Sequence, residues 1–279
     1  MTERILMKTV PLFAALALCL GLASNLLAQT NPGAPPPLPE SKAQGVLNQS
    51  EKDGRFTFIV FTKDDSPAYR TMLQTVKSGV ATRPKTATYT TADANAAGEQ
   101  ALVEKLGIAR APMPLTVAIA PNGAVTGIFP KAIQDEHLTA SIVPPTMMRC
   151  MKSLQNQKLV FVCLTHDSKT QAMAPAGVQL LTLDPDFKER IELVSMFVDD
   201  PAESRFLDQM KVKPAEVSGP TAVLIAPPGV LVGQYGAKAT RQEIATAIHK
   251  AGQCCDDPNC KHNQAAPTTP PAKTTSRSK

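Results

Sequence analysis

Apolar runs of strand length alternate with segments of helical periodicity along the first half of the chain. Helices are predicted at 41–54, 67–78, 94–106 and 134–142, and strands at 55–62, 86–89, 115–120 and 124–129. The last two strands form a hairpin. Buried strands that alternate with helices and end in a hairpin predict an α/β domain, with a central mixed β-sheet and helices on both faces.

The second half of the chain repeats this order. Helices are predicted at 145–157, 202–210 and 241–251, a helical turn at 168–174, and strands at 158–165, 191–198, 221–226 and 230–235. The phrase from Pro114 to Gly123, a proline, an apolar β-rich run and a turn with glycine, recurs from Pro220 to Gly229. The chain is therefore predicted to be an internal duplication, with domains at 40–143 and 144–252.

The N-terminal segment is predicted to be a secretory signal peptide. Lys8 is followed by an apolar run from Val10 to Leu22, and small residues lead to an expected cleavage after Ala28. This run is shorter than the roughly 18 to 20 apolar residues that a membrane span needs. The mature chain is expected to start with a Pro-rich linker at 29–39 and to be exported, to a periplasm or the medium, without a membrane span.

The net charge of +5 lies at the two ends of the chain. Residues 1–28 carry one net positive charge, and residues 261–279 carry the rest on Lys261, Lys273, Arg277 and Lys279, with no acid. The body between them is neutral, which argues against a nucleic-acid-binding protein and against an acidic calcium buffer. Residues 253–279 are predicted to be a cysteine-containing segment followed by a disordered basic tail.

The order β-α-β-α-β-β-α, with a proline entering the hairpin and a Pro-x-Gly turn inside it, resembles the thioredoxin fold. The closest resemblance is to the secreted thioredoxin-like subgroup, and it covers residues 41–143 and 145–252 in tandem. In that family the proline before the third strand is cis. The resemblance therefore implies cis peptide bonds at Met113–Pro114 and at Gly219–Pro220.

The cysteine pair of that family is missing from both copies. The resemblance places the two cysteines where this chain has Asp65 and Ala68, and again where it has Ser168 and Gln171. No Cys-x-x-Cys occurs anywhere in the sequence. Without a thiolate at this helix end, dithiol exchange at the usual place is not expected, and an enzymatic role is disfavoured.

Residues 166–168, His-Asp-Ser, contain the residue types of a hydrolase triad. Sequence neighbours seldom form one, because the three groups must converge from separate elements. We expect Asp167 or Ser168 to cap a helix instead.

The resemblance also implies a peptide groove between the loop after the first strand and the loop before the third. The residues that would form it are Asp65, Ala68, Met113 and Pro114 in the first domain, and Ser168, Gln171, Gly219 and Pro220 in the second. Exposed backbone at such a proline pairs with an extended peptide without any thiol. The leading interpretation is an exported, non-catalytic protein- or peptide-binding or scaffold module that needs no cofactor.

Five cysteines remain after removal of the signal. Cys150 and Cys163 lie in apolar elements and are expected in the core. A cluster at the C-terminal end brings three thiols and an imidazole within nine residues: Cys254, Cys255, Cys260 and His262. Oxidation to a disulfide is the default in an exported chain, and Zn²⁺ or Cu⁺ binding is the other interpretation. The alternative hypothesis is therefore a thiol-redox or soft-metal-handling protein that uses this cluster.

Overall fold

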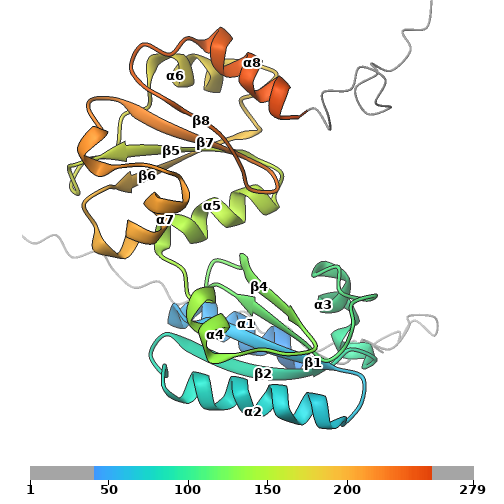
Figure 1. Cartoon of the computed structure of the whole chain (residues 1–279). Coiled ribbons are helices and arrows are strands. Elements are labelled where there is room, and N and C mark those ends of the chain that lie inside the picture. Colours follow the sequence, from blue (N-terminus) through green and yellow to red (C-terminus); the bar gives the residue numbers. More distant parts are fainter. Residues whose placement is uncertain (1–40, 253–279) are drawn as a thin grey trace, which may run out of the picture. The chain divides into compact units, whose positions relative to one another are not determined.

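A computed structural model describes residues 41–252 of the chain, which contain two four-stranded mixed sheets (Figure 1). The strand order is β2-β1-β3-β4 in the first sheet and β6-β5-β7-β8 in the second. In each sheet the central strand pairs in parallel with one neighbour and antiparallel with the hairpin on its other side. The fold class expected from the sequence is confirmed: two thioredoxin-like domains, each a central mixed sheet with helices on both faces.

The two domains contain corresponding elements in the same order. The first has α1 (Lys42–Asp53), β1 (Phe56–Thr62), α2 (Pro67–Ala81), β2 (Ala87–Asp93), η1 (Ala97–Glu99), α3 (Gln100–Lys105), β3 (Leu115–Ile119), β4 (Val125–Pro130) and α4 (Asp135–Ser141). The second has α5 (Pro145–Gln155), β5 (Leu159–Thr165), α6 (Ala176–Leu183), β6 (Ile191–Phe197), η2 (Pro201–Glu203), α7 (Ser204–Gln209), η3 (Pro214–Glu216), β7 (Thr221–Ala226), β8 (Val230–Tyr235) and α8 (Arg241–Ala251). None of these described helices is long and apolar enough to cross a membrane.

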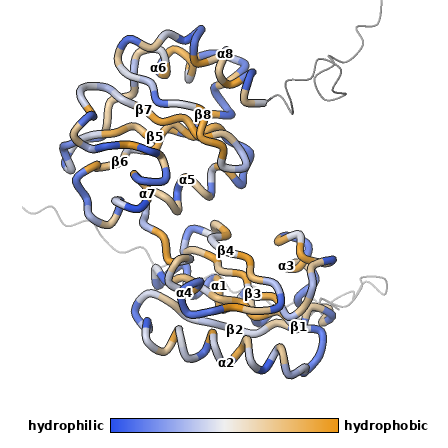
Figure 2. Tube along the Cα trace, viewed as in Figure 1, coloured by the Kyte–Doolittle hydropathy of each residue, from blue (hydrophilic) through white to orange (hydrophobic). Residues whose placement is uncertain are grey.

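The central strands are buried on both faces, and alternate residues enter two separate cores. In β1, Phe58 and Val60 pack with α2 and α4, whereas Ile59 and Phe61 pack with α1 and α3. Strand β5 repeats this division, with helices α5 and α7 on one face and α6 and α8 on the other. Figure 2 shows the resulting hydrophobic colour along the sheets of both domains. Helices on both faces explain why these strands read as continuous apolar runs.

A buried glutamate fixes the start of the first helix in each domain. Glu99, 6% exposed, accepts a hydrogen bond from the Ser41 hydroxyl (2.6 Å) and one from the Ala43 N–H (3.3 Å). Glu203, 3% exposed, accepts from the Thr146 N–H (3.2 Å) at the start of α5. The first N–H groups of a helix have no partner inside the helix, so a carboxylate there satisfies them and complements the helix dipole. In α1 this adds to the local cap, in which the Ser41 hydroxyl accepts from the Gln44 N–H (2.9 Å), whereas the N-cap residue of α5, Pro144, provides no such side-chain bond.

The second domain departs from the prediction directly after β5. The helical turn predicted at 168–174 is wrong, and helix α6 begins only at Ala176. Pro175 disfavours a helical conformation at the residue before it, and the Ala172 N–H donates to the Ser195 hydroxyl of β6 (2.8 Å). This segment therefore runs beside β6, and Ser168 does not lie at a helix N-terminus.

The two prolines before the hairpins also differ. The Met113–Pro114 bond is cis, as the resemblance implies, but Gly219–Pro220 is not, so the prediction for the second domain is wrong. There Gly219 has φ +65°, a left-handed conformation, and it turns the chain into β7. The other cis bond of the described residues is Pro227–Pro228, in the hairpin turn.

Helix α6 approaches the start of α8 closely at a glycine. A Cβ atom added at Gly177 would lie far inside van der Waals contact of the Ala239 carbonyl oxygen. Gly45, in the exposed part of α1, has nothing within 4 Å of such a Cβ. Alanine substitutions at these two glycines therefore separate the effect of close packing on stability from the effect of helix propensity.

We expect Gly177→Ala to lower the free energy of unfolding by about 1 to 3 kcal/mol, because a backbone carbonyl must move. Gly45→Ala is the matched control and should raise it by up to about 1 kcal/mol, through helix propensity alone. Urea unfolding of both variants measures these values. An unchanged or raised stability of Gly177→Ala would contradict the close packing.

Candidate functional site

The first-domain candidates lie where α2 and β3 begin. Asp65 and Ala68 are exposed, Met113 is half-buried against the core on the α1 side, and Pro114 is buried. The Asp65 carboxylate forms an ion pair with Arg70 (2.8 Å). Within the described residues the four candidates share no hydrogen bond, so nothing beyond their positions marks a site here.

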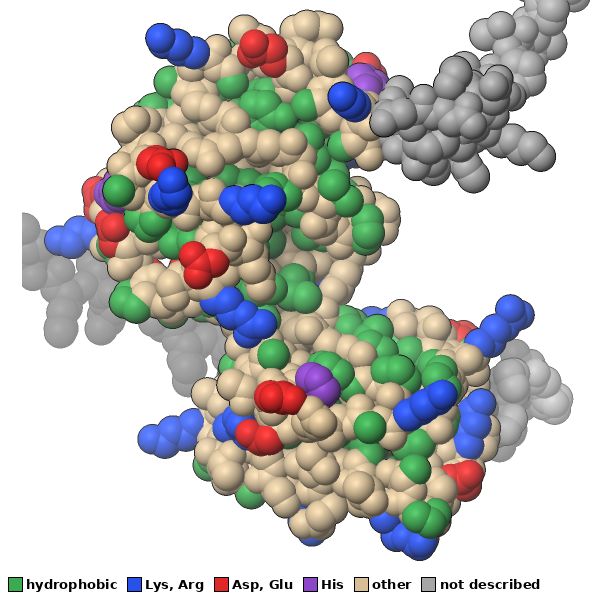
Figure 3. All heavy atoms as spheres, in the orientation of Figure 1, with side chains coloured by type: hydrophobic (Ala, Val, Ile, Leu, Met, Phe, Trp, Pro, Cys, Tyr) green, Lys and Arg blue, Asp and Glu red, His purple; other side chains and the backbone are tan. Residues whose placement is uncertain are grey.

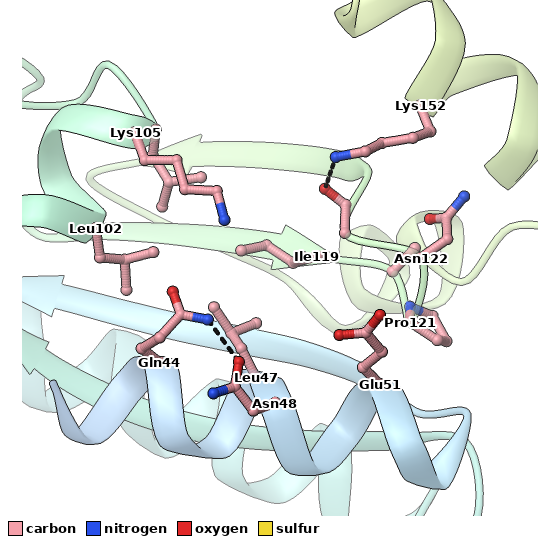
Figure 4. A pocket seen from close by; sticks show the side chains of 13 residues that line it. Gln44, Leu47, Asn48, Glu51, Leu102, Lys105, Ile119, Pro121, Asn122 and Lys152 are labelled. Carbon is pink, nitrogen blue, oxygen red and sulfur yellow. Dashed lines mark hydrogen bonds between the residues drawn. The ribbon is translucent and has the colours of Figure 1, made fainter.

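A hollow of about 220 Å³ lies at the opposite end of β3 in the same domain (Figure 4). Leu47, Leu102 and Ile119 contribute apolar side chains, and Glu51 and Lys105 contribute charged ones. Figure 4 shows the Gln44 amide donating to the Asn48 side chain (2.8 Å) along the α1 side. Because β3 runs from Leu115 to Ile119, this hollow does not coincide with the predicted groove at Pro114.

The second-domain candidates, by contrast, line one cavity of about 650 Å³. Gln171, Gly219 and Pro220 are among its residues, whereas Ser168 is not. We call this cavity the second-domain groove, formed by Leu164, Thr165, His166, Asp167, Thr170, Gln171, Met173, Val217, Gly219 and Pro220. The structure thus brings together three of the four residues that the sequence predicted for this groove.

The lining of the second-domain groove is largely apolar. Leu164, Val217 and Pro220 contribute hydrophobic side chains, and so does Met173, which is 65% exposed. Small-molecule and peptide sites commonly combine such an apolar lining with a few polar groups. The polar groups here include the His166 ring, the Asp167 carboxylate and the backbone at Gly219.

The loop after β5 is held by a turn that both domains share. The Asp167 N–H donates to the Thr165 hydroxyl (3.0 Å), and the Asp167 carboxylate accepts from the Lys169 N–H (2.8 Å). In the first domain Asp64 occupies the same place, with its carboxylate accepting from the Ser66 N–H (3.1 Å). Asp167 therefore caps a turn, and the prediction that it or Ser168 caps a helix is wrong.

His166 bridges two other loops. Its Nδ1 lies 2.7 Å from an Asp199 carboxylate oxygen, and its Nε2 lies 3.2 Å from the Val217 carbonyl oxygen. The hydrogen bond to Asp199 raises the pKa of His166 above the ordinary value, and the Val217 carbonyl adds to this. Both partners accept hydrogen bonds, so the arrangement suits a protonated ring that donates from both nitrogens.

Asp199 is a site residue that was not predicted from the sequence. Its separation from His166 gives no local signal, but β5 and β6 are parallel, with Thr165 opposite Phe197. Residues just beyond these positions therefore emerge at the same edge of the sheet. Knowledge that β5 and β6 pair would have predicted that Asp199 lies close to His166.

These contacts exclude a hydrolase triad at His-Asp-Ser. The His166 Nε2 faces a carbonyl and not a hydroxyl, and the Asp167 carboxylate binds the Lys169 N–H and the Thr170 hydroxyl. A nucleophilic serine needs a base within hydrogen-bond reach that a third group orients. In this geometry His166 joins loops and does not activate a nucleophile.

The two cysteines in the described part of the chain are core residues, as expected. Burial raises the pKa of Cys150 to about 12 and that of Cys163 to about 11. Cys254, Cys255, Cys260 and His262 lie outside the described residues, so the disulfide and metal interpretations stay predictions. Between residues 41 and 252, no group of three His, Cys, Asp or Glu residues is placed to hold a metal ion.

Acidic and basic side chains are interspersed on the face drawn in Figure 3. No broad patch of one sign is visible there, which agrees with the neutral body expected from the sequence.

No protein-family model matches the chain, and no curated protein matches it. Among solved structures it is similar to a disulphide isomerase from Xylella fastidiosa Temecula1 (17% identity, TM-score 0.29, 36% of this chain and 91% of the other). It is also similar to the NTD_N/C domain of alkylhydroperoxide reductase AhpF from Enterococcus faecalis (16%, 0.29, 74% and 98%). A third is zinc-bound human ERp44 (10%, 0.32, 75% and 59%). At such scores these similarities carry nothing about activity, and the fold rests on the strand order.

We expect Cys150 and Cys163 to resist alkylation in the native protein, because the thiolate is the reactive form and burial disfavours it. Iodoacetamide labelling at pH 8, followed by peptide mass spectrometry, should modify both only after denaturation. Labelling of either residue at the same rate in native and denatured protein would contradict their burial.

Proposed function

We propose that this chain is an exported, non-catalytic protein that binds an extended peptide segment in the second-domain groove. The observation that carries the proposal is a single cavity lined by apolar side chains and by the backbone around Gly219. The missing Cys-x-x-Cys and the burial of Cys150 and Cys163 support a role without thiol chemistry in residues 41–252. The fold then serves as a scaffold for the groove.

The backbone beside the groove supports recognition of an extended chain. Within the described residues, the N–H groups of Ser218 and Gly219 donate no hydrogen bond, and the Gly219 carbonyl accepts one, from the Thr221 hydroxyl (3.3 Å). An extended peptide can pair with such groups as an added strand, and main-chain pairing is tolerant of sequence. The apolar lining would then select a hydrophobic side chain.

The expected affinity follows from the size of that apolar contact. Full burial of one valine or leucine side chain contributes about 1.5 to 3 kcal/mol. This corresponds to roughly a tenfold to hundredfold change in dissociation constant. A hydrophobic residue in the bound segment should therefore decide whether binding is detectable.

A fluorescein-labelled ten-residue peptide that alternates valine with serine and threonine tests the proposal. Fluorescence anisotropy should show saturable binding to the full mature chain. We expect Met173→Asp to weaken it by about tenfold or more, because a charge then replaces an apolar group of the groove.

Leu183→Asp is the matched control, since Leu183 is 75% exposed on α6 and does not line the groove. It should bind the peptide as the unaltered chain does. Equal loss in both variants, or no binding by the unaltered chain, would reject the proposed function.

The second candidate function places the activity in the C-terminal cluster. The observation that favours it is the density of soft ligands between Cys254 and His262. In that case the folded domains would support a metal or redox segment that lies outside the described residues.

Changing Cys254, Cys255 and Cys260 together to serine separates the two functions. Under the leading proposal the triple variant binds the alternating peptide with unchanged affinity. Loss of peptide binding, together with loss of stoichiometric zinc or copper from the purified chain, would favour the second candidate.

A further inference from the structure

Three segments of the second domain meet at one imidazole. His166 follows β5, Asp199 follows β6, and Val217 precedes β7. The ring contacts the Asp199 carboxylate at 2.7 Å and the Val217 carbonyl at 3.2 Å. Val217 and His166 both line the second-domain groove, so this contact fixes one wall of the groove against the loop after β5.

The contact needs a proton on each ring nitrogen. A neutral imidazole has one N–H group, so one of its nitrogens presents a lone pair. That lone pair would face either the Asp199 carboxylate or the Val217 carbonyl, and both are acceptors. Deprotonation therefore removes one of the two hydrogen bonds and replaces it with a repulsive contact.

The other charged groups around His166 are occupied elsewhere. The Asp167 carboxylate binds within its own turn, and the Asp200 carboxylate accepts from the Ala202 N–H (2.9 Å). From η3, Lys213 forms an ion pair with Glu216 (2.8 Å). Asp199 is thus the carboxylate that bonds to His166, and the first domain has Lys63 at the corresponding place.

We infer that protonated His166 is a clamp that holds the Val217–Pro220 wall of the groove, and that loss of its proton releases this wall and weakens peptide binding. The contacts of His166 support the clamp directly. Only its effect on peptide affinity rests on the proposed function. Peptide binding at the proposed site is then regulated by pH.

The direction of the pH effect follows from the charge. The hydrogen bond with Asp199 raises the pKa of His166 above the ordinary value of about 6.5. A raised pKa means that the clamp is complete below the ordinary value and is lost as pH rises through the raised one. Peptide binding should therefore be tighter in acid than in alkali.

Two measurements on the full mature chain test the clamp between pH 5.5 and 9. The first follows the His166 ring and the Val217 methyl groups by NMR. Both should titrate together, above the ordinary histidine range. Asp199→Asn should move this shared titration to lower pH, because the carboxylate charge is gone.

The second measurement is the affinity for the alternating valine peptide over the same range. We expect it to fall by roughly twofold to tenfold across the His166 titration, the value of one hydrogen bond. His166→Gln should make the affinity independent of pH. His249→Gln is the matched control, since His249 lies on α8 outside the groove, and it should leave both profiles unchanged.

The outcomes distinguish the clamp from the proposed function. If the Val217 methyl groups do not follow His166, or if Asp199→Asn leaves the titration unmoved, the clamp is overturned. If they do follow it but the peptide binds at no pH, the clamp stands and the proposed function is rejected. An affinity that varies identically in the His166→Gln chain would also overturn the clamp.

Discussion

Burial of the central strands on both faces is the constraint on which the rest of this structure depends. Strands β1 and β5 each lie between two cores, so nearly every residue along them is apolar. Apart from Thr57, which is buried within β1, the polar side chains of these two strands lie where the strands end. In the second domain Thr165 ends β5, His166 and Asp167 follow it, and all three line the groove.

The same constraint explains how much of the fold the sequence predicts. The apolar runs, the repeated proline phrase and the helix at Pro67 are local signals, and each corresponds to an observed element. The pairing of His166 with Asp199 depends on two strands meeting, which no local pattern encodes. Of the residues predicted for a groove in the second domain, Gln171, Gly219 and Pro220 line one cavity, and its charged contact depends on strand pairing.

Two errors in the second domain, the helical turn at 168–174 and the helix cap at Asp167 or Ser168, have a common origin in the loop after β5. In the first domain α2 begins at Pro67, just after the shared aspartate turn, whereas in the second α6 begins at Ala176. The residues between remain outside any helix, and Met173 among them is exposed. The hydrophobic periodicity of the sequence does not reveal that α6 begins so late, because Pro175 and the contact with Ser195 determine where the helix begins. The delay also gives the second domain its groove.

The buried glutamates Glu99 and Glu203 have a consequence for the order in which the chain gains structure. Helix α1 is the first element of its domain and carries a local cap, Ser41, whose hydroxyl accepts from the Gln44 N–H. Glu99, 58 residues after Ser41, adds an acceptor for the Ser41 hydroxyl and for the Ala43 N–H. A nascent chain that has not yet emerged as far as Glu99 therefore lacks these two hydrogen bonds at the start of α1. Completion of the first helix is in this way coupled to the arrival of the segment after β2, so that each domain closes as a cooperative unit rather than helix by helix.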